Sequence, residues 1–237
     1  MNWELNNINT SKETLSLSKQ LNVSNTIASL LVSRKIKTFE QAKKFFRPSL
    51  KDLHDPFLMK DMDKAVDRIL EAVKNNENIL VYGDYDVDGT SSVALVCKFL
   101  RSNTNNQIGT YIPDRYDEGY GISFKSIDYA SDNEFTLIIA LDCGIKALDK
   151  VSYANKKKID YIICDHHKPG ETIPLAIAVL NPLREDCNYP FKFLCGCGIG
   201  FKLIQALSIS QENWDSNVES YLDLVSVAIG ADLVPLV

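Results

Sequence analysis

The stretch that most constrains the fold of this chain lies at residues 79–92, Ile-Leu-Val-Tyr-Gly-Asp-Tyr-Asp-Val-Asp-Gly-Thr-Ser-Ser. Its apolar start predicts a buried strand, and the glycine followed by hydroxyl residues indicates the start of a helix. Between them stand three aspartates at alternate positions, Asp84, Asp86 and Asp88. Carboxylates so close together repel one another unless a cation holds them ionised, and oxygen-preferring divalent metals do this best. The stretch is therefore a candidate metal site.

Two other interpretations apply to these aspartates. They are also suitable as turn residues or as N-caps of a helix that begins near Thr90. The pattern matches the first half of an EF-hand loop, but the twelfth position, which needs a bidentate glutamate, is Leu95. A strand rather than a helix also precedes the loop. The EF-hand interpretation therefore fails, whereas a capping role stays open.

Apolar periodicity predicts strands and helices in alternation, which implies βαβ units with right-handed crossovers. The expected strands are 79–83, 107–112, 136–141, 159–164 and 175–180, and the expected helices are 61–74, 91–101, 123–130, 146–157, 198–207 and 217–229. We therefore expect an α/β fold with a doubly wound, mostly parallel sheet flanked by helices.

A small helical extension is expected at residues 1–55, ahead of the main domain at residues 56–237. Residues 1–20 are rich in Asn, Ser and Thr, which predicts an extended or poorly ordered segment. Thr38 with Gln41 three residues later matches the capping box of a short helix.

Composition and charge limit the class of protein. No apolar run approaches the roughly 18 residues that a membrane helix needs. The six cysteines lie mostly in apolar runs and no signal peptide precedes them, which favours a reducing cytoplasm over a disulfide framework. The formal net charge of −5 argues against a protein that coats nucleic acid by bulk electrostatics. Two bound divalent cations would bring that charge to about −1, so a phosphodiester substrate is not excluded.

Polar residues also follow two later strands of the predicted sheet. Asp142 comes directly after one, and the run 165–167, Asp-His-His, comes directly after the next. In open α/β sheets ligands bind beyond the carboxyl ends of the strands, so these residues and the first three aspartates are expected at one edge. Each is commonly a turn or capping residue when taken alone. Three strands that all end in metal-ligating residues favour a binding site.

A further aspartate, Asp232, follows the last predicted helix. Its position is equally consistent with a turn and with a contribution to the same cluster. Carboxylates with one or two imidazoles suit Mn²⁺ or Mg²⁺ better than the sulfur-rich sites of zinc or copper do. Five or more carboxylates suggest two metal ions.

Four ordered motifs resemble those of the DHH phosphoesterase superfamily: Gly-Asp-Tyr-Asp-Val-Asp-Gly, Leu-Asp-Cys-Gly, Asp-His-His and Gly-Ala-Asp-Leu-Val-Pro. The stretches 53–59, 112–122 and 195–202 narrow the resemblance to the RecJ family of single-stranded-DNA-specific exonucleases. The resemblance runs from about residue 20 to the last residue.

The resemblance implies a phosphodiesterase with two Mn²⁺ or Mg²⁺ ions that removes nucleotides from the 5′ end of single-stranded DNA in repair and recombination. Its implied partners are single-stranded DNA and a single-strand-binding protein or helicase, with no membrane. Carried over residue by residue, the metal ligands are Asp84, Asp86, Asp88, Asp142, His166 and Asp232. RecJ proteins continue into a second, DNA-gripping domain and an oligonucleotide-binding domain, and this chain stops at Val237. We therefore expect a cleft that lacks one wall.

A two-metal mechanism assigns roles to the residues of the second and third motifs. Asp142 is expected to bridge the metals, because its strand lies between those of the first and third motifs. His166 is expected to bind a metal through one ring nitrogen while Asp165 orients the other. His167 is expected to donate a hydrogen bond to the scissile phosphate.

Substrate contacts are expected from the loop after the second strand. Arg115 is suited to hold a phosphate with both arms of its guanidinium, and Tyr116 and Tyr120 are available for base stacking. A surface ion pair of Arg115 with Asp114 or Glu118 is the alternative.

Two other functions stay open. The first is a small-molecule enzyme of the same superfamily, such as an inorganic pyrophosphatase or a cyclic-dinucleotide or oligoribonucleotide phosphodiesterase. Those typically carry a His-led first motif, whereas this chain has the Asp-led form. The second is an inactive nucleic-acid-binding module, because the second domain is missing. A gel-shift and a nuclease assay on one sample separate them.

Overall fold

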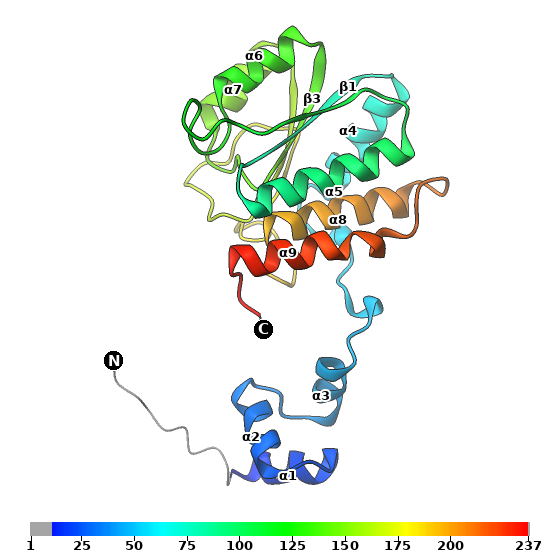
Figure 1. Cartoon of the computed structure of the whole chain (residues 1–237), viewed down its shortest axis with the longest axis vertical. Coiled ribbons are helices and arrows are strands. Elements are labelled where there is room, and N and C mark those ends of the chain that lie inside the picture. Colours follow the sequence, from blue (N-terminus) through cyan, green and yellow to red (C-terminus); the bar gives the residue numbers. More distant parts are fainter. Residues whose placement is uncertain (1–10, 237) are drawn as a thin grey trace. The chain divides into compact units, whose positions relative to one another are not determined.

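The computed structural model describes residues 11–236, and the chain divides into two compact units between Leu53 and His54 (Figure 1). The first unit contains the helices α1 (Lys12–Leu21), α2 (Asn25–Ser33) and α3 (Phe39–Phe46) and the 3₁₀ helix η1 (Leu50–Asp52).

The start of the first unit differs from the sequence-based expectation. Lys12–Leu21 forms α1, so the prediction of an extended segment is wrong there, and residues 1–10 lie outside the described part. The side chain of Ser11 accepts a hydrogen bond from Thr14 N, which caps the helix, and Leu17 packs into a small core with α2. Polar composition hid a helix that tertiary packing stabilises. The capping box at Thr38 is confirmed.

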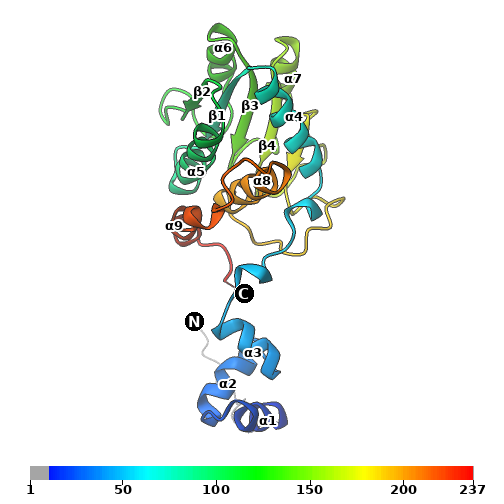
Figure 2. The ribbon, with the colours of Figure 1, turned by 90° about the vertical axis from the view of Figure 1, so that its right-hand side faces the viewer.

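The second unit alternates strands with helices. Its elements are η2 (Pro56–Leu58), α4 (Met62–Lys74), β1 (Asn78–Gly83), α5 (Val87–Asn103), β2 (Ile108–Tyr111), α6 (Phe124–Asp132), β3 (Phe135–Leu141), α7 (Leu148–Lys156), β4 (Asp160–Cys164), β5 (Ala178–Leu180), α8 (Gly196–Ser210), η3 (Val218–Tyr221) and α9 (Leu222–Asp232). The five strands pair in parallel in the order β2-β1-β3-β4-β5, and they lie at the centre of the unit (Figure 2). The predicted doubly wound α/β fold is confirmed.

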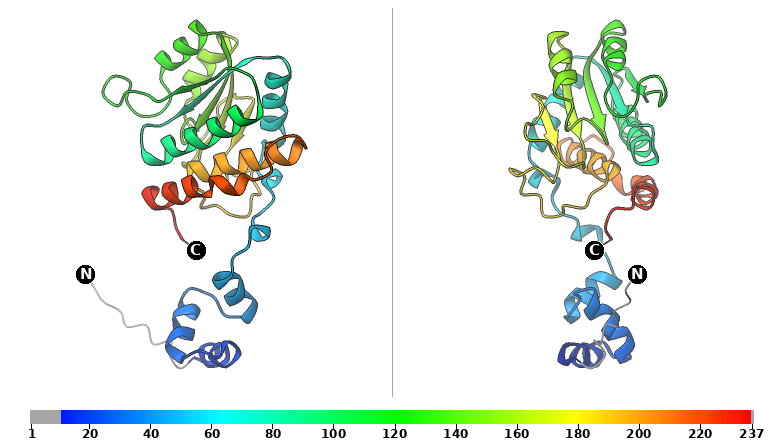
Figure 3. Two further views of the ribbon diagram at one scale, coloured as in Figure 1. Left: turned by 45° about the vertical axis from the view of Figure 1, so that its right-hand side comes forward. Right: turned by 90° about the vertical axis from the view of Figure 1, so that its left-hand side faces the viewer.

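Alternate residues of each strand supply the two cores of the unit. Ile79 and Val81 of β1 belong to the core under α4, α5, α8 and α9, whereas Leu80 and Tyr82 belong to the core under α6 and α7. Helices α5, α8 and α9 run side by side in both Figure 1 and Figure 3. Both faces of the sheet are therefore covered, which explains why its strands are nearly continuous apolar runs.

Each predicted helix of the second unit differs from the observed one at one end or both, and two of these differences affect the site. Helix α5 begins at Val87 rather than Ser91, because the side chain of Asp86 accepts the N–H of Gly89 and caps it; Asp88 then lies in the first turn. Helix α9 continues through Gly230 to Asp232. A glycine costs a helix only about 1 kcal/mol, so it need not end one.

None of the helices among residues 11–236 is both long and apolar enough to cross a membrane.

Candidate metal centre

The carboxyl edge of the sheet gathers polar residues from three adjacent strands. Strand β3 lies between β1 and β4, so Asp84, Asp142 and Asp165, which follow these strands, leave the sheet at one edge. Asp142 has a left-handed backbone with φ of 61°, and its N–H donates to Cys164 O at 2.8 Å. The chain therefore turns sharply at Asp142 while still tied to β4.

His166 stands at the centre of a group of acidic residues. Its Nε2 lies 3.2 Å from Asp142 Oδ1, 3.7 Å from Asp232 Oδ2 and 3.9 Å from Asp88 Oδ2. We call Asp88, Asp142, His166 and Asp232 the His166 cluster. Its members come from α5, the end of β3, the end of β4 and the last turn of α9, so the cluster exists only when these distant segments are folded together.

Helix α8 approaches the His166 cluster with its N-terminus. Asp88 Oδ2 accepts the N–H of Gly196 at 2.6 Å, and Asp88 Oδ1 accepts the N–H of Cys197 at 2.7 Å. The positive end of the helix dipole therefore stabilises this carboxylate. A Cβ atom at Gly196 would lie 2.6 Å from Asp142 Cβ, so the close approach requires a glycine.

Several ligand atoms of this edge lack partners. Asp84 Oδ2, Asp142 Oδ1 and His166 Nε2 are buried and accept or donate no hydrogen bond within residues 11–236; the last two are close but lack hydrogen-bond geometry. Burial, opposed in part by His166 and reinforced by Asp88, raises the pKa of Asp142 to about 7. Burial also raises the pKa of Asp84 and that of Asp88. Acceptors held in this way fit a divalent cation, which would satisfy them and restore their charge.

His167 points to a different set of partners. Its Nδ1 lies 2.7 Å from Asp165 Oδ1, and its Nε2 lies 3.0 Å from the hydroxyl of Tyr120. The hydrogen bond with Asp165 raises the pKa of His167 to about 9, so the ring donates to both partners at neutral pH. Burial raises the pKa of Asp165, but hydrogen bonds from His167 hold it below its usual value. The expectation that Asp165 orients His166 is therefore corrected: it orients His167.

A family model described as the DHH family, N-terminal domain, matches residues 78–229, which is more than half of the sequence. The chain belongs to the DHH family. Asp232 lies just beyond the matched segment, although its carboxylate is part of the His166 cluster.

Three relatives place this DHH chain near the RecJ exonucleases. It is 39% identical over 236 residues to the single-stranded-DNA-specific exonuclease RecJ of Bacillus subtilis, an alignment that covers 100% of this chain and 29% of the relative. It is similar to exonuclease RecJ bound to manganese, with 29% identity and a TM-score of 0.68, over 75% of this chain and 44% of that one. It is also similar to RecJ in complex with Mn²⁺ from Thermus thermophilus, with 25% identity and a TM-score of 0.76. That match covers 94% of this chain and 31% of the other. The chain thus spans about a third of the length of its curated relative.

The other predicted site residues of the DHH domain lie near the cluster or on its rim. Asp84 and Asp86 belong to neither of the two groups whose ligand atoms lie within 4.8 Å of one another, which are Asp88, His166 and Asp232, and Asp142, His166 and His167. Asp84 is fully buried, whereas Asp86 is exposed and caps α5. Asp86 therefore has the helix-capping role that the sequence analysis left open.

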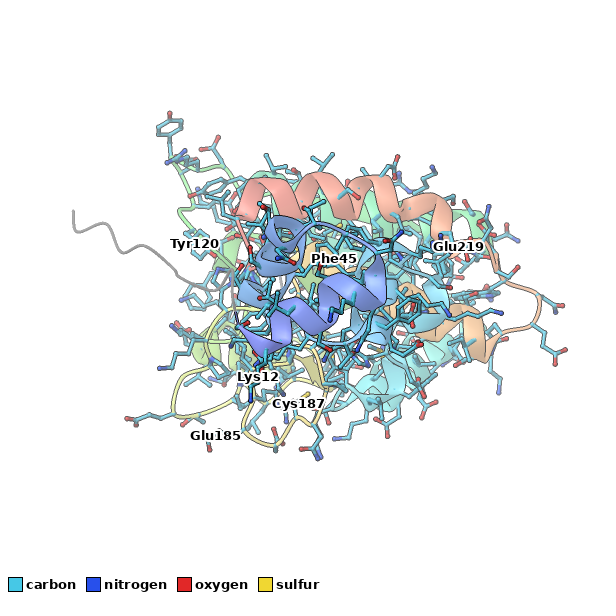
Figure 4. The ribbon with its side chains drawn as sticks, turned by 90° about the horizontal axis from the view of Figure 1, so that it is seen from below. Lys12, Phe45, Tyr120, Glu185, Cys187 and Glu219 are labelled. Carbon is cyan, nitrogen blue, oxygen red and sulfur yellow. The ribbon has the colours of Figure 1, made fainter. Side chains whose placement is uncertain are left out.

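The predicted substrate loop stands beside His167. Arg115 makes no ion pair with Asp114 or Glu118; its guanidinium lies 5.3 Å from the ring centre of Tyr85. Tyr116 is 96% exposed. Figure 4 shows Tyr120 and Glu219 toward opposite ends of α9.

Sequence reasoning missed two residues of this region. Tyr85 lies edge-on to Tyr120, with ring centres 6.4 Å apart, and so joins the loop to the first motif. Its position between Asp84 and Asp86 was the available signal. The amide of Gly196 was missed because main-chain donors leave no mark in a sequence beyond a glycine-rich stretch.

Proposed function

We propose that this chain hydrolyses phosphodiester bonds of single-stranded DNA from the 5′ end with the help of two Mn²⁺ or Mg²⁺ ions. The observation that carries the proposal is the set of buried ligand atoms without partners, Asp84 Oδ2, Asp142 Oδ1 and His166 Nε2. Membership of the DHH family and similarity to RecJ exonucleases supply the substrate class.

The residues that would hold the ions are Asp84, Asp86, Asp88, Asp142, His166 and Asp232. When bound, such ions supply a hydroxide at neutral pH and stabilise charge on the phosphoryl oxygens. Asp142 would hold an ion together with His166, which it approaches more closely than Asp88 or Asp232 do. Asp86 would first have to release Gly89 N or use its second carboxylate oxygen.

The remaining residues position the substrate and the proton. Asp165 fixes the ring of His167 through Nδ1, which leaves Nε2 directed to Tyr120 and available as a donor to a phosphate oxygen. Arg115, with no carboxylate partner among the described residues, is a second donor for the strand. Tyr116 offers an exposed ring on which a base can stack.

The partners and location follow from the proposed substrate. Single-stranded DNA is the substrate, a single-strand-binding protein or a helicase supplies it, and the protein works in the cytoplasm. The DHH domain at residues 56–237 carries the reaction, and residues 1–55 contribute no group to it.

The test compares metal response and hydrolysis in one sample. Mn²⁺ is expected to raise the melting temperature and to support release of nucleotides from a single-stranded oligonucleotide; Asp142→Ala should remove most of the first effect and nearly all of the second. Asp132→Ala, at an exposed position at the end of α6, is the matched control. A melting temperature that does not respond to Mn²⁺ would contradict the metal site. Hydrolysis of pyrophosphate or a cyclic dinucleotide in place of the oligonucleotide would instead support the small-molecule alternative.

A further inference from the structure

A pocket of about 280 Å³ is lined in part by His167. It is lined by the segment around Ile122, by the stretch between β3 and α7, and by Asp165 and His167. We call this space the His167 pocket. Apart from Asp165 and His167, none of its residues has a role in the metal centre.

The lining of the pocket combines apolar side chains with two lysines. Ile122 and Ile145 are buried and give the interior an apolar lining, to which the small side chain of Ala147 also contributes. Two cations stand at the edge. Lys150 is already paired with Asp149, but Lys146 is exposed and makes no hydrogen bond or ion pair with any residue of the described range. The pocket therefore offers an apolar slot beside one uncompensated positive charge.

His167 connects the pocket to the metal centre. One of its ring nitrogens lies within 4.8 Å of ligand atoms of Asp142 and His166, while the ring itself lines the pocket. A ligand with an anionic group at the metal centre and an apolar group in the pocket would pass directly over this imidazole. Tyr120 borders the same passage, and its hydroxyl contacts His167.

Two glycines flank Tyr120 in its loop. Gly119 and Gly121 both have φ of 79°, and a Cβ at either position would meet no atom within 4 Å. Neither glycine is required by crowding, so the pair serves the turn itself. The ring of Tyr120 is held by its hydroxyl contact with His167 and by edge-on packing with Tyr85.

We propose that the His167 pocket binds the nucleobase of the nucleotide whose phosphate lies at the metal centre. This inference rests on the proposed function. A flat, largely apolar ring matches the lining, and Lys146 is placed to meet a backbone phosphate. The volume is just below the roughly 300–1,000 Å³ of sites for drug-sized ligands, which suits one base. Tyr120 then closes the slot from the side.

Binding of mononucleotides, which contain no phosphodiester bond to hydrolyse, tests this in the presence of Mg²⁺ without any turnover. The probes are dTMP, dAMP and 2-deoxyribose 5-phosphate, which has the sugar and phosphate but no base. We expect both nucleotides to bind at least about tenfold more tightly than the sugar phosphate in calorimetric titrations, because only they bury a ring. Nucleotides should also shift the methyl NMR signals of Ile122 and Ile145, and the sugar phosphate should not.

Variants sharpen the assignment. Ala147→Leu fills the slot and should abolish the preference for nucleotides, whereas Ala147→Ser keeps the space and should retain it. Lys146→Ala should weaken all three probes several-fold, and Lys156→Ala, at the other end of α7, should change nothing. Equal affinity of the three probes, or unmoved isoleucine methyl signals with bound nucleotide, overturns the proposal even if Ala147→Leu fails to fold.

The failure of this inference and that of the proposed function are distinguishable. Mn²⁺-dependent hydrolysis, together with equal binding of nucleotides and the sugar phosphate, would contradict base binding in the pocket and leave the proposed function intact. Preferential binding of nucleotides in a protein that shows no response to Mn²⁺ would contradict the proposed function and leave a nucleotide-binding pocket.

Discussion

The acidic side chains at the two edges of the central sheet differ in whether they have compensating partners. At the amino edge, Arg68 lies 2.6 Å from Glu77 Oε2 and 2.6 Å from Asp160 Oδ2, and Thr136 donates to Glu77 as well. At the carboxyl edge, buried carboxylates face one another around a single imidazole. The first group is a completed network of hydrogen bonds and opposite charges, whereas the second is left incomplete.

The pKa values of the carboxyl groups express this difference. Burial raises the pKa of Glu77, but hydrogen bonds from Arg68 and Thr136 lower it below its usual value. The pKa of Asp142 is raised to about 7, mainly by burial. Acidic residues near opposite ends of neighbouring strands thus form ion pairs at one edge and lack a compensating charge at the other. A perturbed carboxylate marks a candidate site only when its environment fails to compensate its charge.

The largest expected effect is at the amino edge. Arg68→Met should lower the free energy of unfolding by roughly 2–3 kcal/mol, less than the 3–5 kcal/mol of a fully buried pair, because the side chain of Asp160 is 38% exposed. Urea unfolding measures this, and Mn²⁺ affinity measured in parallel should stay unchanged. A large loss of Mn²⁺ affinity would show that the two edges are coupled.

The next effect concerns the approach of α8. Gly196→Ala should weaken Mn²⁺ binding about tenfold, since a Cβ there displaces Asp142 or the helix start, and tenfold corresponds to about 1.4 kcal/mol. Gly170→Ala is the control, because its nearest neighbours would lie at least 3.8 Å from the new Cβ. Equal affinity in the two variants would mean that Asp142 is not a ligand.

A gain of stability is expected from Asp142→Asn in the metal-free protein. At pH 8, above the raised pKa of about 7, the native carboxylate is ionised and lacks a cation. The neutral amide should stabilise the protein by about 1 kcal/mol while removing its response to Mn²⁺. Thermal unfolding with and without Mn²⁺ measures both changes. A loss of stability at pH 8 would indicate that the native charge is already compensated.

The smallest effect is a pH dependence at the amino edge. The pKa of Glu77 is lower in the fold than in the unfolded chain, so its contribution is present above pH 4.5 and is lost as the pH falls through the folded value. The destabilisation caused by Glu77→Gln should therefore shrink as the pH falls from 6 to 3. Unfolding free energies of both proteins across this range test it, and a constant difference would argue against the ion pair.

The sequence was sufficient for the sheet and for the edge at which the site forms. Apolar runs mark the strands, and the polar residues directly after them, such as Asp142, must then lie at the carboxyl edge. The boundary of α5 was harder, because Asp84, Asp86 and Asp88 are all good caps and only the fold decides that Asp86 is the one used.

Side-chain direction was beyond what the sequence can determine. His166 and His167 are neighbours of the same type, and the turn after β4 decides which of them Asp165 reaches. The approach of α8 to Asp88 also joins segments more than a hundred positions apart through main-chain amides, which every residue except proline possesses.

The bond between Asp88 and the start of α8 gives the molecule an internal reporter. The amide protons of Gly196 and Cys197 point at a carboxylate whose electron density an arriving cation would withdraw. Their chemical shifts and their exchange with deuterium should therefore register occupancy of the centre directly, in the absence of substrate. The N-terminal amides of α8 that hold the Asp88 carboxylate would thus also report when that carboxylate binds a cation.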